Sequence, residues 1–390
     1  MEDRFVYADN AATTPLDRKV LDKMMPFLTT QYGNASTLYT LGQSSQAAVA
    51  EARQNVAEVI GARPEEIYFT GSGTEADNMA LHGVLKGRQA AGRRHLITTT
   101  FEHPAILNTA KALEKEGFRV TYISVDERGL VRLDELERAI TDDTVLVSVM
   151  AANNEIGSIQ PLHRIGELCR KHGVFFHTDA VQAFAHIPIN VEELNIDLLS
   201  LSAHKLCGPK GVGALYVRRG VNVAPHITGG GQERGLRSGT ENVAGIVGLG
   251  EAARLRGSQM EQEMAHVGAL SKRLIEGVMN AIPKTVLTGA RIGYRLPGTC
   301  SFAFEGIEGE SLVLRLDNRG ICASTGSACS TGSLDPSHVL MAVGLSHEIA
   351  HGSLRLTLGV QNTEEDVDYI LSILPGVVQD LREMSPVWHG

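Results

Sequence analysis

Short apolar runs alternate along this chain with longer stretches in which apolar residues recur at helical spacing. The short runs are typical of buried strands, and they are Ile67–Thr70, His95–Thr99, Arg119–Val125, Thr144–Met150, Val174–Thr178, Asp197–Leu201 and Val212–Val217. Helical spacing lies between most of them, notably over Ala105–Glu116, Leu133–Ile140 and Pro161–His172. This alternation predicts an α/β domain with a mostly parallel sheet, in which ligands bind beyond the carboxyl ends of the strands.

The pattern changes after residue 242. Long helical stretches follow between Val243 and Met279, and shorter segments come after them, with Cys300–Phe304, Glu310–Arg319 and Ser353–Leu358 the clearest. A chain of 390 residues exceeds the size at which one hydrophobic core keeps growing. We therefore predict a large domain at residues 15–255 and a smaller α+β domain at residues 256–390, on which residues 1–14 pack.

Composition narrows the classes of function. The formal charge of −9 argues against nucleic acid as the main partner. No apolar run reaches membrane length, and the opening residues show neither a basic flank nor an apolar core, so we expect a cytoplasmic protein. The five cysteines contain no C-x-x-C pair, which predicts neither a disulfide framework nor a metal site. Any cysteine chemistry would come from a single thiol.

One lysine stands at a tight junction between two apolar runs. Lys205 follows Asp197–Leu201 and precedes a glycine-rich turn and the run Val212–Val217. Burial between strands disfavours the charged amine and makes it nucleophilic enough to attack a carbonyl. A solvated lysine in a loop is the alternative.

Polar residues also follow other predicted strands. Gly73 and Thr74 lie where a strand turns into a helix, a place that suits a phosphate, although Thr74 could equally be a helix cap. Asp179 follows a buried strand, where its carboxylate would suit a protonated ring nitrogen and Gln182 a neighbouring oxygen; a helix N-cap aspartate is the rival reading. His103 is a candidate for ring stacking and proton transfer, although structural histidines are commoner.

Together these groups favour pyridoxal phosphate as the cofactor. A phosphate site, a carboxylate, a histidine and a lysine, each at the end of a strand, match the needs of that molecule, which serves as an electron sink. Asn154, in a turn after the strand that ends at Met150, would add an amide at the same edge of the sheet. Each signal is weak alone, and their convergence carries the prediction.

Several motifs then resemble those of a known family: SAHKLCGPKGVGALYV, HTDAVQ, GSGTEADN, EHPAIL, NNEIG and GGGQERGLRSGTEN. They are similar to the cysteine desulfurases of the aminotransferase class V superfamily, and the likeness runs from the DNAATTP opening to about Gly359. The resemblance implies the type I pyridoxal-phosphate fold and a homodimer. It makes Lys205 the lysine that binds the cofactor covalently.

The resemblance also implies roles for further residues. The cofactor-binding group is Gly73, Thr74, His103, Asn154, Asp179, Gln182, Ser202, His204, Lys205 and Thr240, with Thr240 reaching the phosphate of the neighbouring subunit. Substrate binding falls to Arg355, Asn154 and Asn34, and catalysis to Cys329, Lys205 and His103. For Arg355, an arginine that faces outward from a strand is the alternative.

Cys329 indicates the reaction. It stands in a segment rich in Ser, Thr and Gly, which offers a thiol little apolar cover and so favours a reactive group over a buried one. The spacing resembles the long-loop subgroup of the family, in which this cysteine carries the persulfide. The resemblance therefore implies conversion of L-cysteine to L-alanine, with the sulfur passed to an iron–sulfur scaffold or another acceptor protein.

Alternatives remain at this stage. A selenocysteine lyase would use the same groups, and a non-catalytic subunit of an iron–sulfur assembly complex would need only the exposed thiol. Cys207, two residues after Lys205, departs from the aromatic residue or histidine more usual in the family. We expect it to pack, and a second reactive thiol beside the cofactor stays open.

Overall fold

The structure is a computed structural model that describes residues 4–326, 336–386 and 388. Its largest sheet has the spatial order β2 (Ile67–Thr70), β8 (Gly213–Val217), β7 (Leu198–Ser202), β6 (Phe175–Asp179), β5 (Thr144–Ser148), β3 (His95–Thr99) and β4 (Arg119–Ile123). Only β8 runs antiparallel to its two neighbours, and the other pairs are parallel. The predicted α/β class with a mostly parallel sheet is confirmed.

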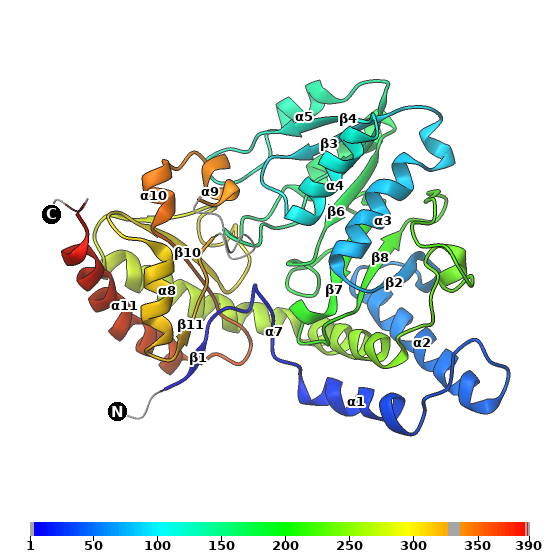
Figure 1. The fold of residues 1–390 in the computed structure, drawn as a ribbon, viewed down its shortest axis with the longest axis horizontal. Coiled ribbons are helices and arrows are strands. Elements are labelled where there is room, and N and C mark those ends of the chain that lie inside the picture. Colours follow the sequence, from blue (N-terminus) through cyan, green and yellow to red (C-terminus); the bar gives the residue numbers. More distant parts are fainter. Residues whose placement is uncertain (1–3, 327–335, 387, 389–390) are drawn as a thin grey trace.

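Helices cover both faces of this sheet (Figure 1). They are α1 (Arg18–Thr29), α2 (Thr40–Val59), α3 (Gly73–Leu85), α4 (Pro104–Lys115), α5 (Leu133–Ala139), α6 (Leu162–His172) and the first part of α7 (Val243–Ala281), with 3-10 turns η1 (Pro64–Glu66), η2 (Arg88–Ala90), η3 (Ala203–Lys205) and η4 (Glu233–Gly235). Strands β3, β5, β7 and β8 are buried along their whole length, as expected of strands covered on both sides.

A second group of elements lies at the other end of the molecule (Figure 1). A three-stranded antiparallel sheet has the order β12 (Ser353–Thr357), β10 (Thr299–Phe304) and β9 (Thr285–Leu287), and β1 (Val6–Tyr7) pairs with β11 (Ile321–Cys322). The helices here are α8 (Gly309–Asp317), α9 (His338–Ala342), α10 (His347–His351) and α11 (Glu364–Met384). The N-terminal strand thus lies beside a strand more than 300 residues later in the chain.

One long helix joins the two groups. Where the sequence indicated several helical stretches, α7 is continuous over 39 residues, and Asn242 caps it by accepting a hydrogen bond from the Gly245 N–H. Its first half packs on α1 and α2, and it also packs on α11. The boundary predicted near residue 255 falls inside this helix, and the division at that point stays a prediction.

Candidate active site

A cavity of about 540 Å³ opens at the carboxyl edge of the large sheet. Its walls come from segments that directly follow β2, β3, β5, β6 and β7, and from the N-terminal residues Ala11–Thr13. Ten of the predicted site residues line it: Gly73, Thr74, His103, Asn154, Asp179, Gln182, Ser202, His204, Lys205 and Arg355. The cavity therefore lies where ligands usually bind to a parallel sheet, beyond the carboxyl ends of the strands.

Lys205 lies at the end of η3, directly after β7. Its Nζ donates hydrogen bonds to the carbonyl oxygens of Ala11 and Ala12, at 2.5 and 2.8 Å. The side chain is half-buried and lines the cavity, so it is not the solvated loop lysine of the alternative reading. The N-terminal segment thus places two hydrogen-bond acceptors, both carbonyl oxygens, beside the Lys205 amine.

The N-terminus of α3 forms another wall. Ser72 caps the helix by accepting a hydrogen bond from the Glu75 N–H, so Thr74 is not the cap, and its side chain is exposed in the first turn. A Cβ atom at Gly73 would lie 2.7 Å from Val181 Cγ2, so only glycine permits this approach to the segment after β6. Backbone N–H groups at a helix start favour an anion such as phosphate.

Ser202 and His204 lie beside that helix start in the wall of the cavity. The Ser202 side chain is buried, and the His204 ring Nδ1 is 3.2 Å from the Thr13 hydroxyl. Burial, followed by the charges of Lys205 and Lys210, lowers the pKa of His204 to about 4. His204 is therefore neutral at pH 7, and the lysines supply the positive charge near the anion site.

Asp179 is the last residue of β6 and is 5% exposed. Its Oδ1 accepts the Val181 N–H at 2.9 Å, and turns rather than a helix follow it, which removes the N-cap reading. Burial raises the pKa of Asp179, and His103 and Lys205 oppose that shift. A buried carboxyl of this kind gains most from a positively charged partner in the cavity.

His103 has a structural role and also lines the cavity, and the sequence had left open which of these two positions it takes. It caps α4 through Nδ1, which accepts the Ala105 N–H at 3.1 Å, and its ring also lines the cavity. Burial lowers the pKa of His103, whereas Asp179 raises it. Because Nδ1 accepts the Ala105 N–H, the neutral imidazole carries its proton on Nε2, and it takes up a second proton at Nδ1 only when that hydrogen bond is broken.

Arg355 enters the cavity from the other group of elements. It lies on β12 and is 3% exposed, so the outward-facing alternative is wrong. Its Nη2 donates to Asp9 Oδ1 at 2.9 Å and its Nη1 to the Asn154 carbonyl oxygen at 3.1 Å. Its Nε is buried and has no hydrogen-bond partner among the residues that the structure describes. An arginine held in this way is suited to a carboxylate, which would satisfy the remaining donor.

These groups fit pyridoxal phosphate. A helix start flanked by a hydroxyl and a neutral histidine suits the phosphate, a buried carboxyl suits the protonated ring nitrogen, and an amine suits the aldehyde. All three kinds of group line one cavity.

Comparison with known proteins decides the family. The model of the aminotransferase class-V family matches residues 6–370. This chain belongs to that family. The cysteine desulfurase IscS of Clostridium botulinum (strain Hall) is 54% identical over 98% of this chain and 97% of its own length. The corresponding enzyme of Methanosarcina thermophila is 52% identical over 99% and 95%.

Solved structures of similar proteins support the same family. A NifS-like protein superposes with a TM-score of 0.90 at 41% identity, covering 97% of this chain and all of its own. The protein SspA in complex with cysteine gives a TM-score of 0.80 at 36% identity, covering 92% and 100%. The protein is thus a pyridoxal-phosphate-dependent cysteine desulfurase of the type I fold, and neither rival reading is favoured. Cysteine desulfurases use L-cysteine and are generally dimeric.

Three predicted site residues are not part of the cavity as the structure describes it. Thr240 lines an adjoining cavity, which shares Gly71 and Gly211 with the active-site cavity. Asn34 is exposed in the connection between α1 and α2, where its Oδ1 accepts the Ser36 N–H. Cys329 lies outside the described residues. The roles of these three residues stay predictions.

The cavity also contains residues that the sequence reasoning missed. They include Asp77, Met150, Lys210 and the backbone of Ala11–Thr13. Asp77 stands in the same motif as Thr74, one helical turn later, and this spacing is the signal that could have indicated it. The N-terminal segment carried no comparable signal, because its contact with Lys205 joins residues almost 200 positions apart.

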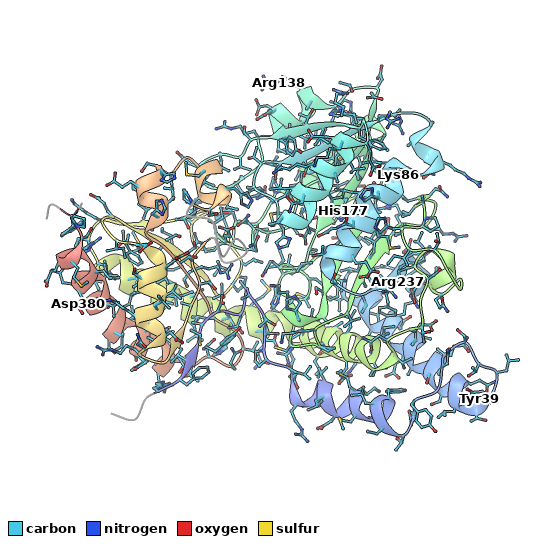
Figure 2. The ribbon with its side chains drawn as sticks, in the orientation of Figure 1. Tyr39, Lys86, Arg138, His177, Arg237 and Asp380 are labelled. Atoms are coloured by element: carbon cyan, nitrogen blue, oxygen red, sulfur yellow. The ribbon has the colours of Figure 1, made fainter. Side chains whose placement is uncertain are left out.

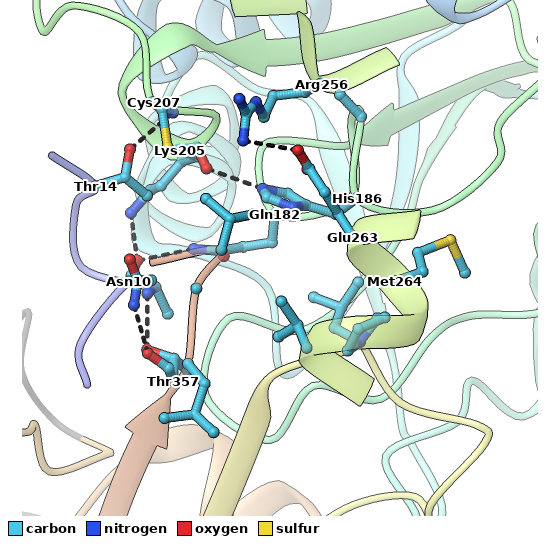
Figure 3. A pocket seen from close by; sticks show the side chains of 18 of the residues that line it. Asn10, Thr14, Gln182, His186, Lys205, Cys207, Arg256, Glu263, Met264 and Thr357 are labelled. Carbon is cyan, nitrogen blue, oxygen red and sulfur yellow. Dashed lines mark hydrogen bonds and ion pairs between the residues drawn. The ribbon is translucent and has the colours of Figure 1, made fainter. Parts of the chain in front are cut away.

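A smaller cavity of about 70 Å³ lies on the other side of Lys205 and Gln182, which line both cavities. Figure 3 shows Arg256 and Cys207 at this cavity; Arg256 forms ion pairs with Glu263, at 2.7 Å, and with Asp17, at 3.1 Å. Cys207 is 8% exposed, with a left-handed φ of 61°. Burial raises the pKa of the Cys207 thiol, so little of the reactive thiolate forms at neutral pH.

We therefore expect Cys207→Ala to form alanine from L-cysteine at a rate within about twofold of wild type, because the thiol contributes packing rather than chemistry. Alanine release and mass spectrometry of the persulfide measure the outcome. A persulfide found on Cys207 in the wild-type enzyme would contradict it.

Glu155 is a buried carboxyl next in the chain to Asn154, which lines the cavity around Lys205. Its Oε2 accepts a hydrogen bond from the Ser337 hydroxyl, and a Cβ atom at Gly326 would lie 2.9 Å from the same oxygen. Burial raises the pKa of Glu155 to about 7, against the opposing effects of Ser337 and Arg355. Glu155 therefore contacts the described residues that flank positions 327–335.

The raised pKa of Glu155 predicts a pH dependence of stability. Its contribution is fully present below the unfolded value of 4.5 and is lost as the pH rises through about 7. Between about pH 5 and pH 8 the wild type should lose up to about 3 kcal/mol of unfolding free energy relative to Glu155→Gln. Urea unfolding of both proteins at the two pH values measures the difference. A parallel response of the two proteins would contradict it.

Proposed function

We propose that the cavity around Lys205 is the desulfurase active site, with each lining residue in the role that its contacts suit. Bound pyridoxal phosphate supplies an electron sink. The α3 N-terminus with Thr74, Ser202 and His204 would hold its phosphate, and Asp179 would pair with the protonated ring nitrogen. Gln182, whose Nε2 donates to the Ala11 carbonyl oxygen at 3.0 Å, borders the same space.

Lys205 would hold the cofactor until the substrate amine replaces it, and its Nζ would then take the proton from the substrate Cα. Arg355 carries the substrate half of the proposal. It lines the same cavity as Lys205 and Asp179, and its Nε has no hydrogen-bond partner in the described part of the chain. A cysteine carboxylate would complete the hydrogen bonding of that guanidinium. Asn154 lies beside it, because its carbonyl oxygen accepts a hydrogen bond from Arg355.

Cys329 would then take the sulfur. Its thiolate attacks the substrate sulfur, an S–S bond forms and the Cβ–S bond breaks. The electron pair of the broken bond remains on the substrate side, where a proton delivered to Cβ completes alanine. His103 is the candidate for proton transfer at the attacking or leaving sulfur.

Substitution of Arg355 tests the assignment of the substrate carboxylate. Because hydrogen bonds to charged groups contribute about 1.5–3 kcal/mol, Arg355→Lys should raise KM for L-cysteine by about 10- to 100-fold. Arg295→Lys is the control, since Arg295 is also buried, and its side chain donates, within the described residues, to the carbonyl oxygens of Thr288, Ala290 and Thr299. An unchanged KM in Arg355→Lys would remove Arg355 from the substrate site.

Partners and compartment are further parts of the proposal. We infer a homodimer in which Thr240 reaches the phosphate of the second copy, an iron–sulfur scaffold or other sulfur-acceptor protein as partner, and a cytoplasmic location. In the described part of the chain, no helix has the length and apolarity needed to span a membrane, and no group of three or more metal-ligating side chains was found. We also propose domains at residues 15–255 and 256–390, the second packed against residues 1–14.

Two hydrophobic clusters support that division of the chain. Among the buried residues of α7, the first cluster extends to Leu255 and the second begins at Val267. The second includes Val6 and Ala8 from the N-terminus, and the first includes one residue from beyond α7, Leu296. Capture of radiolabelled sulfur from Cys329 by candidate acceptors would identify the partner.

A further inference from the structure

An acidic side chain lies at the start of the helix that borders the proposed phosphate site. Glu75 is in the first turn of α3, and its Oε2 accepts the Gly71 N–H at 2.9 Å. Gly71 itself lines the active-site cavity. A carboxylate at a helix N-terminus stabilises the helix, but it would repel a second anion bound at the same place. The phosphate proposed above therefore requires this negative charge to be balanced.

An arginine far along the chain balances the charge of Glu75. Arg237 belongs to the segment between β8 and α7 (Figure 2), and its Nε and Nη2 donate to the Oε1 and Oε2 of Glu75 at 2.7 and 3.3 Å. A Cβ atom at Gly71 would lie 2.7 Å from Glu75 Oε2 and 3.6 Å from Arg237 Nη2, so both charges lie directly against Gly71. The side chains of Arg237 and Glu75 are 24% and 19% exposed, and water and salt therefore screen the pair only in part.

A second ion pair holds the segment that carries Arg237. Glu233, four residues earlier, is buried, and its carboxylate accepts two hydrogen bonds from Arg53, both at 2.7 Å, and one from the Phe69 N–H at 2.9 Å. Arg53 comes from α2 and Phe69 from β2. The backbone that carries Arg237 is therefore anchored to the large sheet independently of Glu75.

We propose that Arg237 is a positioning residue for the cofactor phosphate, which acts by neutralising Glu75 beside Gly71. This rests on the proposed phosphate site at the α3 N-terminus and deepens it. Glu75 stays in place as the acceptor for the Gly71 N–H, which holds the turn into α3, while the ion pair adds no net charge to the site. The positive end of the helix dipole then acts on the phosphate without an opposing charge from Glu75.

This role predicts opposite effects for the two halves of the ion pair. Arg237→Gln leaves the charge of Glu75 unbalanced and should raise the dissociation constant of pyridoxal phosphate about tenfold. Glu75→Gln leaves the charge of Arg237 unbalanced and should bind the cofactor at least as tightly as the wild type. The double variant removes both charges and should bind within about threefold of wild type. Titration of each apoenzyme with pyridoxal phosphate, followed through the visible absorption of the bound cofactor, measures the dissociation constants.

Equal weakening by Arg237→Gln and Glu75→Gln would show that the pair only maintains the fold, and it would overturn the proposal. Pyridoxal, which lacks the phosphate, is the second ligand: its affinity should be unchanged in all three variants, whereas a structural defect would lower it as well. Arg218→Gln is the matched control, because it breaks an ion pair with Asp197, at 3.0 Å, at the amino end of β7. It should leave both affinities unchanged, and a tenfold loss there would also count against Arg237.

Two further variants complete the test. Arg237→Lys keeps the charge without the two-point geometry, so it should bind pyridoxal phosphate within about threefold of wild type; it replaces Arg237→Gln if that variant does not fold, and a larger loss would overturn the proposal. Ser202→Ala tests the phosphate site itself. If it leaves the preference for pyridoxal phosphate over pyridoxal unchanged, the proposed phosphate site is wrong and the role of Arg237 fails with it. A reduced preference in Ser202→Ala with none in Arg237→Gln overturns the role of Arg237 alone.

Discussion

Cys329→Ala should form alanine from L-cysteine at least about 100-fold more slowly than wild type, because no thiolate remains to attack the substrate sulfur and accept it. Cofactor binding should be unchanged, because the substitution leaves in place the ten cavity-lining residues assigned to cofactor and substrate. Alanine release, persulfide mass spectrometry and the visible absorption of the bound cofactor measure the three expectations.

The control for this experiment is Cys322→Ala, which removes a thiol on strand β11, seven residues earlier in the chain. Burial raises the pKa of Cys322, so its thiol is a weak nucleophile and its loss should leave alanine release near the wild-type rate. Alanine release by Cys329→Ala at the wild-type rate would show that sulfur leaves the substrate without this thiol.

Lys205→Ala should lose covalent attachment of the cofactor and essentially all alanine formation, since the amine both holds the cofactor and moves the Cα proton. Lys210 lines the same cavity five residues later and is the matched comparison. Borohydride reduction of the holoenzyme followed by peptide mass spectrometry should place the cofactor on Lys205 in wild type and in Lys210→Ala. Attachment at Lys210, or retained attachment in Lys205→Ala, would refute the assignment.

The two largest predictions differ in the evidence behind them. Lys205 is placed by contacts with Ala11 and Ala12 and by the cavity it shares with Asp179 and Arg355. Cys329 rests on its sequence context and on the resemblance to the long-loop subgroup of the family. Together the experiments separate the cofactor half of the reaction from the sulfur-transfer half.

Local sequence predicted most of the large sheet. Strands β2 and β3 begin and end at the predicted residues, because a short apolar run bounded by turn residues specifies a buried strand. The ends of β4 and β5 were predicted two residues too long. Val125 stays apolar but lies beyond the strand, where it forms an isolated bridge with Val131, six residues later in the chain.

The features of the active site also divide into those that the sequence predicted and those that it did not. By itself, the sequence determined which strand ends carry polar groups, and parallel strands bring those ends together, so His103, Asp179 and Lys205 could be predicted to meet. Only the tertiary structure decided what completes each group. Arg355 is held by Asp9, and Lys205 by the Ala11 and Ala12 carbonyl oxygens. The periodicity of apolar residues indicates which face of a helix or strand is buried. The charge state of a side chain depends instead on partners far away in the chain, which come into contact with it only after folding.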